Sequence, residues 1–466
     1  MVQVTVSSGR LRACLDGRWG PIRQEVRAQI EASELLRPAH GLPVEAYRER
    51  VLEQARLVSG SRGARLFFPR EHGGEGDLGG ALAAFEVLAL VDLSLLVKLG
   101  VQWGLFGGVI RRLGTAQHHR RYLRDAMTMA LPGCFAMTET GHGSDVQSIR
   151  TTATYDPERQ EFVINTPDDD ARKDYIGNAA RDGRLAAVFA QLITGDASRG
   201  VHAFLVPIRD QRGWPCSGVR IEDCGDKGGL NGVDNGRLWF DRVRVPREAL
   251  LDRFGTVAPD GSYRSPIASE SRRFFTMLGT LVSGRISVAG AGLSACKLAL
   301  TIAVRYGFRA PGQDREVILL DYLQHQRRLL PALCTTYAMH FAQEALVSSL
   351  HEVAEDANPD SREQRQLETL AAGVKAISTW HTTKTIQTCR EACGGAGYLS
   401  VNRLTELRAD TDVFTTFEGD NTVLLQLVAK GLLTNFRDEF ESMDTAATVR
   451  FVADQVVGAV LELTAA

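Results

Sequence analysis

"CFAMTETGHGSDVQSIRTTATYD", residues 134–156, decides how the rest of the sequence divides. An apolar, strand-like run comes first, followed by hydroxyl side chains, two closely spaced glycines and a run rich in threonine. Small side chains and accessible backbone amides of this kind let a bulky polar group come close. From these residues alone three interpretations stay open: a phosphate-bearing cofactor, a metal site, or a tight turn whose glycines have positive φ.

The sequence changes its periodicity at this stretch. From about Val26 to Leu131, apolar residues recur at spacings of three and four, as in YRERVLEQARLV and LAAFEVLALVDLSLLVKLGV, which predicts helices. From there to about Pro246, short strand-like segments alternate with Asp-Pro, Asp-Gly and Asn-Gly turn signals. These segments are TTATY, EFVIN, LAAVFAQLIT, VHAFLVP, VRIE and RLWFDRVRV. Many short strands at this spacing predict a small barrel or sandwich.

From Phe274 onward the pattern is helical again, and several long helices in succession predict a bundle. The sequence therefore predicts an α+β multidomain protein. We expect an N-terminal helical domain over 1–131, a middle β domain over 132–273 and a C-terminal helix bundle over 274–466.

Charge and composition limit the classes of partner. The chain has 466 residues, 44% of them hydrophobic and 24% charged, which is typical of a globular protein. A formal net charge of −2 argues against a nucleic-acid partner. The acidic run at 168–170 lacks a second ligand group at a suitable spacing, so we predict no metal site.

The thiols and the termini bear on location. The eight cysteines include no Cys-x-x-Cys pair, which is typical of reduced thiols in a cytosolic-type compartment. We find neither a secretory signal nor an uninterrupted apolar span of membrane length, and the last residues, LELTAA, are not a peroxisomal tripeptide. These features predict a bacterial-type cytosolic protein without membrane insertion.

"ACGGAGYL", residues 392–399, ends a long predicted helix with three glycines. One glycine would suffice for a helix C-cap. Three at this spacing indicate a backbone that comes close to a ligand, because a Cβ would hold the ligand away.

"DVFTTFEGDNTVLLQL", residues 412–427, places Glu418 between an apolar, β-like run and the start of an apolar helix. Burial beside Phe417 would raise the pKa of the Glu418 carboxyl toward the range of a general base. The alternative, a first-turn glutamate stabilised by the helix dipole, stays open. Asp420 and Asn421 are natural N-cap residues, and for Asp420 we favour that interpretation.

Taken together, these segments resemble the acyl-CoA oxidase branch of the acyl-CoA dehydrogenase and oxidase flavoprotein superfamily. Two further segments, "AQLIT…GVHAFLVPIRD" and "GDKGGLNGVDNGRLWFDRVRVPREALL", resemble its β-domain signature. The resemblance runs in order from about Phe67 to Leu433. It implies an acyl-CoA dehydrogenase-like fold, FAD as cofactor, an acyl-CoA substrate, O2 as electron acceptor and at least a homodimer.

The resemblance also implies roles for single residues. Glu418 matches the catalytic base, and its backbone amide matches a donor to the thioester carbonyl. Ser144 and Gly419 match substrate-binding positions. The positions that match cofactor contacts are Thr138, Ser144, Tyr175, Ile176, Gly177, Arg309, His325, Gln326, Gly394, Gly395, Asp420 and Asn421.

One of these positions departs from the family's usual residue, and several others imply contact between subunits. Tyr175 stands where the family usually has tryptophan. Arg309, the pair His325 and Gln326, and the glycines Gly394 and Gly395 match positions that reach the cofactor of a neighbouring subunit.

Acyl-CoA oxidases usually continue into a further helical domain, whereas this sequence ends at Ala466. We therefore expect that domain to be absent here. The predicted reaction is oxidation of an acyl-CoA to a trans-2-enoyl-CoA, with O2 reduced to hydrogen peroxide. Two alternatives are an acyl-CoA or acyl-carrier-protein dehydrogenase that passes electrons to an electron-transfer flavoprotein, and a non-catalytic member that acts in assembly or ligand binding.

Overall fold

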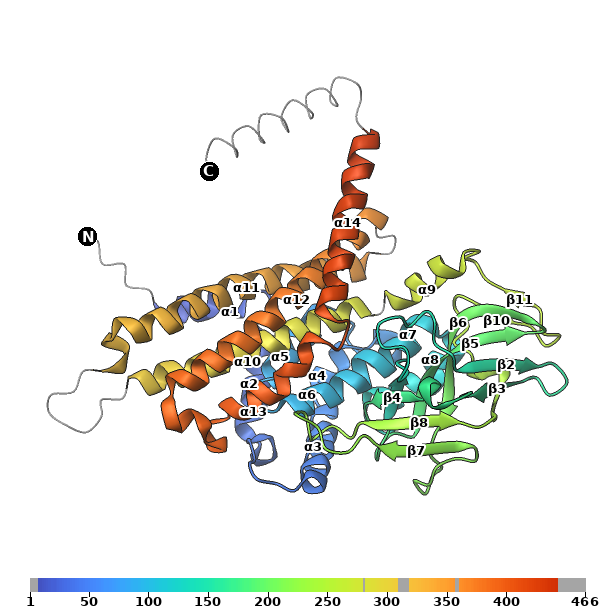
Figure 1. The fold of residues 1–466 in the computed structure, drawn as a ribbon, viewed down its shortest axis with the longest axis horizontal. Helices are drawn as coiled ribbons and strands as arrows, with labels where there is room; N and C mark the ends of the chain where they lie inside the picture. Colours follow the sequence, from blue (N-terminus) through green and yellow to red (C-terminus); the bar gives the residue numbers. More distant parts are fainter. Residues whose placement is uncertain (1–6, 280, 309–317, 357–359, 443–466) are drawn as a thin grey trace.

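The protein consists of helices, then strands, then helices along the chain (Figure 1). The computed structural model describes residues 7–279, 281–308, 318–356 and 360–442. In Figure 1 the strands gather at one end of the molecule, and the first and last groups of helices lie together at the other. The predicted α+β multidomain fold is confirmed, while the domain limits 1–131, 132–273 and 274–466 remain predictions.

The N-terminal part is helical. Its helices are α1 (Ser8–Asp16), α2 (Gly20–Ala32), α3 (Val44–Ser59), α4 (Arg62–Leu66), α5 (Leu78–Leu88), α6 (Leu93–Leu99), α7 (Gly108–Leu113) and α8 (Ala116–Met127). A π-helical segment, η3 (Gly100–Gly107), joins α6 to α7.

Aspartate caps explain where the apolar helices α5 and α6 begin. The carboxylate of Asp77 accepts a hydrogen bond from the backbone amide of Gly80 (2.8 Å). The carboxylate of Asp92 accepts from the amides of Ser94 (2.7 Å) and Leu95 (3.1 Å). Such caps satisfy amides that have no partner within the helix. The run that we predicted as helix is therefore two helices with a cap between them.

The β part contains eleven strands among the described residues. They are β1 (Gly133–Ala136), β2 (Thr152–Asp156), β3 (Glu161–Asn165), β4 (Lys173–Ile176), β5 (Leu185–Thr194), β6 (Ala197–Pro207), β7 (Val219–Asp223), β8 (Gly236–Phe240), β9 (Val243–Pro246), β10 (Thr256–Val257) and β11 (Tyr263–Arg264). The six strand-like segments that we predicted are confirmed as β2, β3, β5, β6, β7 and the pair β8–β9. The β10–β11 hairpin was not foreseen.

Two sheets enclose the core of the β part. The larger sheet has the order β1-β5-β2-β3-β9, with β6 paired to β5, and the smaller has the order β4-β8-β7. Along β3 the buried and partly exposed residues alternate, as the two faces of a strand require. Phe162 and Phe204 from the larger sheet share one apolar cluster with Leu238 and Phe240 from the smaller. Of the two predicted forms, a small barrel or a sandwich, this arrangement is the sandwich.

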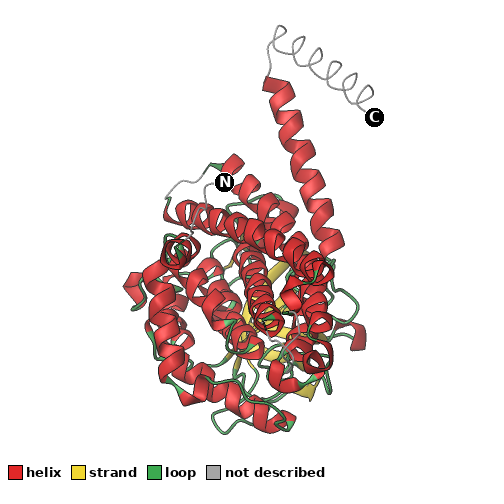
Figure 2. Ribbon diagram, turned by 90° about the vertical axis from the view of Figure 1, so that its left-hand side faces the viewer, coloured by secondary structure: helices red, strands yellow, loops and turns green. Residues whose placement is uncertain are grey.

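The C-terminal part is the predicted helix bundle. It contains α9 (Glu270–Leu278), α10 (Leu281–Gly307), α11 (Leu323–Glu355), α12 (Ser361–Ala392), α13 (Leu404–Asp412) and α14 (Asn421–Ser442). α12 packs against α10, α11, α13 and α14, and α10 also packs against α5. One apolar cluster consequently spans the first and last helical parts. α14 leaves the body of the molecule and projects outward (Figures 1 and 2).

Two helical stretches, 93–113 and 270–307, are long and apolar enough to cross a membrane by length and composition. We had found no such span by inspection of the sequence. Most of each stretch is buried inside the protein, as in the core helices of many globular proteins, so these helices are weak evidence for membrane insertion.

Candidate active site

Glu418 lies in the short link between α13 and α14. The preceding residues form a 3-10 turn, η9 (Val413–Thr415), so the β-like run that we expected before Glu418 is wrong. Its apolar side chains suggested a strand, but they pack within a helical turn instead. Glu418 itself has a φ of +58°, and Gly419 has a φ of +104°. A left-handed conformation is unfavourable for a residue with a Cβ, and such strain often occurs at functional sites.

The carboxyl group of Glu418 packs against helix α10 at Gly284. A Cβ on Gly284 would overlap the Glu418 carboxylate, so this approach requires glycine. The Oε2 atom of Glu418 is buried and has no hydrogen-bond partner among the described residues. A native structure seldom leaves a buried carboxylate oxygen without a partner, so this atom is suited to act on a ligand.

Burial raises the pKa of Glu418 to about 7, although the positive charges of Arg285 and Lys375 act in the opposite direction. Arg285 donates from Nε to the carbonyl of Glu418 (3.4 Å). Lys375 is fully buried on α12 and donates from Nζ to the carbonyl of Gly419 (2.7 Å). A carboxyl group with a pKa near neutrality is suited to general-base catalysis.

Asp420 and Asn421 make contacts within the chain. Asp420 accepts from the amide of Thr422 (2.9 Å), as expected for a cap of α14. The buried Asn421 accepts from Lys375 Nζ (3.0 Å) and donates to Thr379 Oγ1 (3.0 Å). The predicted cofactor contacts of Asp420 and Asn421, and the predicted substrate contact of Gly419, remain predictions.

The residues that match the flavin-binding strand lie on two adjacent segments. Asp174 donates from its amide to the carbonyl of Thr138 (3.1 Å), which joins the segment after β1 to β4. The Tyr175 side chain is 64% exposed, and its φ is +65°. Ile176 is buried, and a Cβ on Gly177 would lie 2.8 Å from the Val101 side chain. An aromatic ring is thus presented near the end of β4, just before a tightly held turn.

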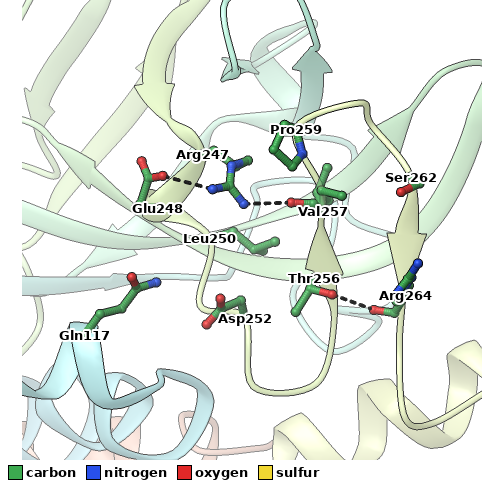
Figure 3. Close-up of a pocket in the computed structure, with 11 residues that line it drawn as sticks. Gln117, Arg247, Glu248, Leu250, Asp252, Thr256, Val257, Pro259, Ser262 and Arg264 are labelled. Carbon is green, nitrogen blue, oxygen red and sulfur yellow. Dashed lines mark hydrogen bonds and ion pairs between the residues drawn. The ribbon is translucent and has the colours of Figure 1, made fainter.

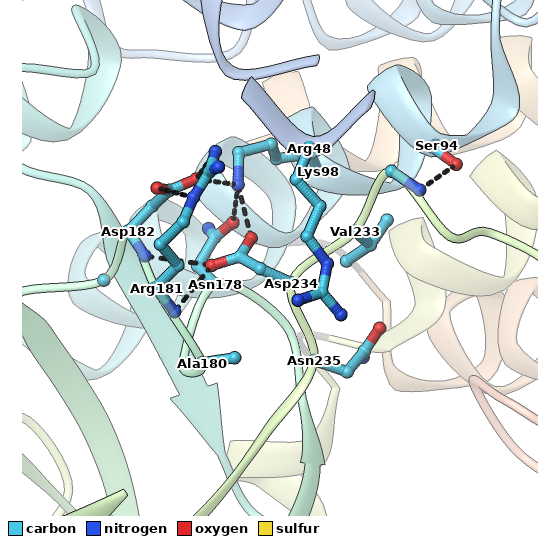
Figure 4. Close-up of polar contacts among 12 residues, drawn as sticks. Arg48, Ser94, Lys98, Asn178, Ala180, Arg181, Asp182, Val233, Asp234 and Asn235 are labelled. Carbon is cyan, nitrogen blue, oxygen red and sulfur yellow. Dashed lines mark hydrogen bonds and ion pairs between the residues drawn. The ribbon is translucent and has the colours of Figure 1, made fainter. Parts of the chain in front are cut away.

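A buried polar cluster holds the end of this turn (Figure 4). Lys98 on α6 donates from Nζ to Asn178 (2.9 Å), Asp182 (2.7 Å) and Asp234 (2.6 Å). Asn178 in turn donates to the carbonyl of Gly133 (2.9 Å). Because the side chains of Lys98 and Asp234 are fully buried, these contacts fix the turn firmly to the N-terminal helices.

A second buried pair lies at the start of β4. Lys173 donates from Nζ to Glu139 (3.0 Å), and both side chains are fully buried. Burial lowers the pKa of Lys173 to about 8, while Glu139 favours its charged form. This pair joins the segments that carry Thr138 and Tyr175.

The glycines of the opening motif do not have the conformation of the tight-turn interpretation. Neither Gly141 nor Gly143 has a positive φ. A Cβ on Gly143 would meet no atom within 4 Å, and Ser144 is exposed. This backbone is therefore accessible, although the cofactor and substrate contacts predicted for Ser144 remain predictions.

The residues that match the neighbouring-subunit contacts gather at one end of the bundle. A Cβ on Gly307 would lie 3.2 Å from His325 Nε2, an atom that has no hydrogen-bond partner in the described part of the chain. Burial lowers the pKa of His325. Gln326 donates to the carbonyl of Leu320 (2.8 Å).

The predicted glycine motif lies close to this end of the bundle. A Cβ on Gly394 would meet only Tyr306 Oη, at 4.0 Å, and a Cβ on Gly395 would meet no atom within 4 Å. Both glycines are exposed. Arg309 lies outside the described residues.

A separate cavity of about 480 Å³ lies between α8 and the β10–β11 hairpin (Figure 3). Arg247 on its wall donates to Glu248 (3.3 Å) and to the carbonyl of Val257 (3.1 Å). Neither Glu418 nor any residue that we matched to the flavin site lines it. We therefore do not assign this cavity to the candidate active site.

The sequence reasoning missed three residues around Glu418, namely Gly284, Arg285 and Lys375. Lys375 did leave a signal, because it is a single lysine within the apolar run LAAGVKAI. Charged residues are rarely fully buried unless they are paired, so such a lysine indicates a specific internal partner. Lys98 in the apolar run LSLLVKLG gave the same signal.

Comparison with known proteins agrees with this architecture. Residues 134–243 match the family model "Acyl-CoA dehydrogenase, middle domain", and residues 278–433 match "Acyl-CoA oxidase, C-alpha1 domain". These two matches define a protein of the acyl-CoA dehydrogenase class.

The chain is 46% identical over 385 residues to acyl-coenzyme A oxidase 2, peroxisomal, of Arabidopsis thaliana, covering 80% of this chain and 55% of that protein. The crystal structure of acyl-CoA oxidase 1 from Yarrowia lipolytica superposes with a TM-score of 0.81 at 31% identity, covering 93% of this chain and 64% of that one. The chain belongs to the acyl-CoA oxidase branch of the acyl-CoA dehydrogenase and oxidase superfamily. It spans about half the length of the curated relatives that it matches.

The prediction of a bacterial-type cytosolic location was wrong. Three relatives from Arabidopsis and one from Homo sapiens carry the word peroxisomal in their names, which points to a peroxisomal location instead. Targeting tripeptides are addresses that receptors read. Cysteine spacing and composition therefore carry no information about them.

Proposed function

We propose that the chain is an FAD-dependent acyl-CoA oxidase that converts an acyl-CoA to a trans-2-enoyl-CoA, a step of fatty acid β-oxidation. One observation carries this proposal: the Oε2 atom of Glu418 is buried and lacks a partner among the described residues, and desolvation raises the pKa of this carboxyl to about 7. A neutral-range carboxyl is matched to removing the weakly acidic proton beside a thioester.

The described residues fit a flavin cofactor. A related structure, acyl-CoA oxidase-2 of Caenorhabditis elegans, was solved with FAD, ascaroside-CoA and ATP. It superposes with a TM-score of 0.79 at 26% sequence identity, covering 95% of this chain and 67% of that one. In this chain, the exposed Tyr175 offers a ring for stacking, and the open backbone at Gly395 leaves room for close approach. Bound FAD would supply the acceptor for the hydride from Cβ and the route by which electrons reach O2.

The residues of the chain would perform the acid–base part of the reaction. Glu418 would remove the proton from Cα of the acyl group. The backbone amide of Glu418 would donate to the thioester carbonyl and so stabilise the negative charge that develops there. Hydrogen bonds from Arg285 and Lys375 to the carbonyls of Glu418 and Gly419 hold the link that carries this amide, so little reorganisation would be needed during the reaction.

We further propose a homodimer. Large apolar side chains are exposed along the bundle, with Tyr398 75% exposed, and contiguous exposed apolar surface often marks an interface. These side chains are Leu323, Leu330 and Phe341 on α11, Ile377 and Trp380 on α12, and Tyr398, Leu399 and Val401 after it. Sedimentation equilibrium of the purified chain measures the mass directly, and a monomer at micromolar concentration contradicts this proposal.

The decisive experiment mixes the FAD-loaded protein with a panel of acyl-CoAs without oxygen, records the loss of flavin colour, and then admits air. Bleaching followed by hydrogen peroxide production supports the oxidase. Bleaching with reduction of an acceptor dye but no peroxide favours the dehydrogenase alternative. A protein that takes up no FAD favours the non-catalytic one.

The variant Glu418→Gln is the matched control for this experiment. It preserves the size of the side chain and removes the basic group. We expect it to bind FAD normally and to show no bleaching with any acyl-CoA, whereas near-normal turnover contradicts the assignment of Glu418 as the base.

A further inference from the structure

Lys375 occupies an unusual position for a lysine. It lies in the middle of α12 and is fully buried. Its ammonium group donates to two acceptors on the segment that carries Glu418, namely the carbonyl of Gly419 (2.7 Å) and Oδ1 of Asn421 (3.0 Å). An ammonium group is costly to bury, so its presence here indicates a specific task.

The same turn of α12 anchors this segment at further points. Asn421 donates from Nδ2 to the carbonyl of Ala376 (3.2 Å) and to Thr379 Oγ1 (3.0 Å). Thr379 itself donates to the carbonyl of Lys375 (2.9 Å). α12 thus holds the backbone immediately after Glu418 in its left-handed conformation.

Lys375 also contributes charge. Two charged groups face the Glu418 carboxyl, Arg285 from α10 and Lys375 from α12. Asp420 in turn faces Lys375, and Glu368 of α12 faces Arg285. Burial lowers the pKa of Lys375 to about 8, with Glu418 and Asp420 acting in the opposite direction. At neutral pH most of Lys375 therefore carries its proton.

We propose that Lys375 is a positioning residue for the base: it fixes the Glu418–Gly419 turn and supplies the positive charge that stabilises the ionised Glu418 carboxylate. The catalytic consequence rests on the proposed function, whereas the effect on the titration of Glu418 does not. A test that measures this titration without turnover therefore separates the two.

The test measures the melting temperature of the purified full chain as a function of pH. Each background, such as Lys375→Met, is measured as a pair of proteins, one with Glu418 and one with the Glu418→Gln substitution. The difference within each pair reports the titration of Glu418, to which the pair that keeps Lys375 adds the change in the Lys375 pKa measured separately below. In the Lys375→Met background we expect the pH midpoint of the Glu418 titration to rise by roughly 1 pH unit, because a nearby opposite charge is lost. Lys375→Arg, which keeps the charge, should restore the midpoint.

Two controls separate charge from structure. Thr379→Val removes a hydroxyl beside the same turn and leaves the charge, so we expect a lower melting temperature with an unchanged midpoint. Lys384→Met removes an exposed lysine from the same helix, and we expect it to change neither the melting temperature nor the midpoint of the Glu418 titration. An unchanged midpoint in Lys375→Met, or an equal change in Thr379→Val, overturns the proposal.

A reciprocal measurement needs no change at Lys375. If the two groups interact, Glu418→Gln must lower the pKa of the Lys375 amine by as much as Lys375 lowers that of Glu418. NMR of labelled lysine in the two proteins measures this difference. Equal lysine pKa values in the two proteins also overturn the proposal.

Discussion

Glu418→Gln should make the protein more stable at neutral pH than the unchanged chain. Because burial raises the pKa of Glu418 from 4.5 to about 7, the folded state keeps a proton that the unfolded state has lost between these two values. The stability of the unchanged chain therefore falls as pH rises through this window, and the deficit is complete above pH 7. Glutamine does not titrate and avoids this cost.

The size of the effect follows from the two pKa values. At 1.36 kcal/mol for each pKa unit, the rise in the pKa of Glu418 from 4.5 to about 7 corresponds to about 3 kcal/mol in the free energy of unfolding. We expect the two proteins to differ by a nearly constant amount below pH 4.5 and the advantage of the variant to grow by about that much up to pH 8.

Urea unfolding at half-unit pH steps, followed by circular dichroism, measures this difference. Apart from Lys375, whose pKa the variant lowers if the two groups interact, the titrating groups are common to both proteins and cancel in the comparison. A difference that stays constant from pH 4 to pH 8 would show that the Glu418 carboxyl titrates normally, and the argument for a buried base would fail.

Three further variants test the contacts around the site. Gly284→Ala places a methyl group against the carboxylate of Glu418, so we expect at least a roughly tenfold loss of kcat with the melting temperature nearly unchanged. Lys98→Met leaves the buried carboxylate of Asp234 without its ion-pair partner and should cost about 3–5 kcal/mol in the free energy of unfolding, measured in urea. Asp410→Leu removes the carboxylate that accepts from a backbone amide 2.6 Å away and should cost about 1–3 kcal/mol by the same measurement.

Local patterns predicted the elements of the fold well. Alternation between turn signals located β2 and β3, because a strand with one buried face must alternate, whereas β5 was found as a continuous apolar run that is buried on both faces. The β10–β11 hairpin escaped notice, since each of its strands has only two residues and too few side chains to form a pattern. The run before Glu418 was mistaken for a strand for a similar reason: short apolar runs suit either state.

The surroundings of Glu418 could not be predicted in the same way. Glu418 was found because it lies in a distinctive motif, but Arg285 approaches it from 133 residues away and Gly284 from the same helix. Such contacts depend on how α10 and α12 turn against one another. Nothing in the local sequence specifies that a particular glycine must face a particular carboxylate.

The left-handed backbone at Glu418 has an evolutionary consequence. Glycine or asparagine would adopt this conformation more easily, and either would remove the buried acidic group. On the proposed assignment of Glu418 as the base, selection for turnover maintains this glutamate despite its cost in stability. In a lineage that no longer needed the reaction, we would expect this position to drift first, while the rest of the scaffold stayed intact.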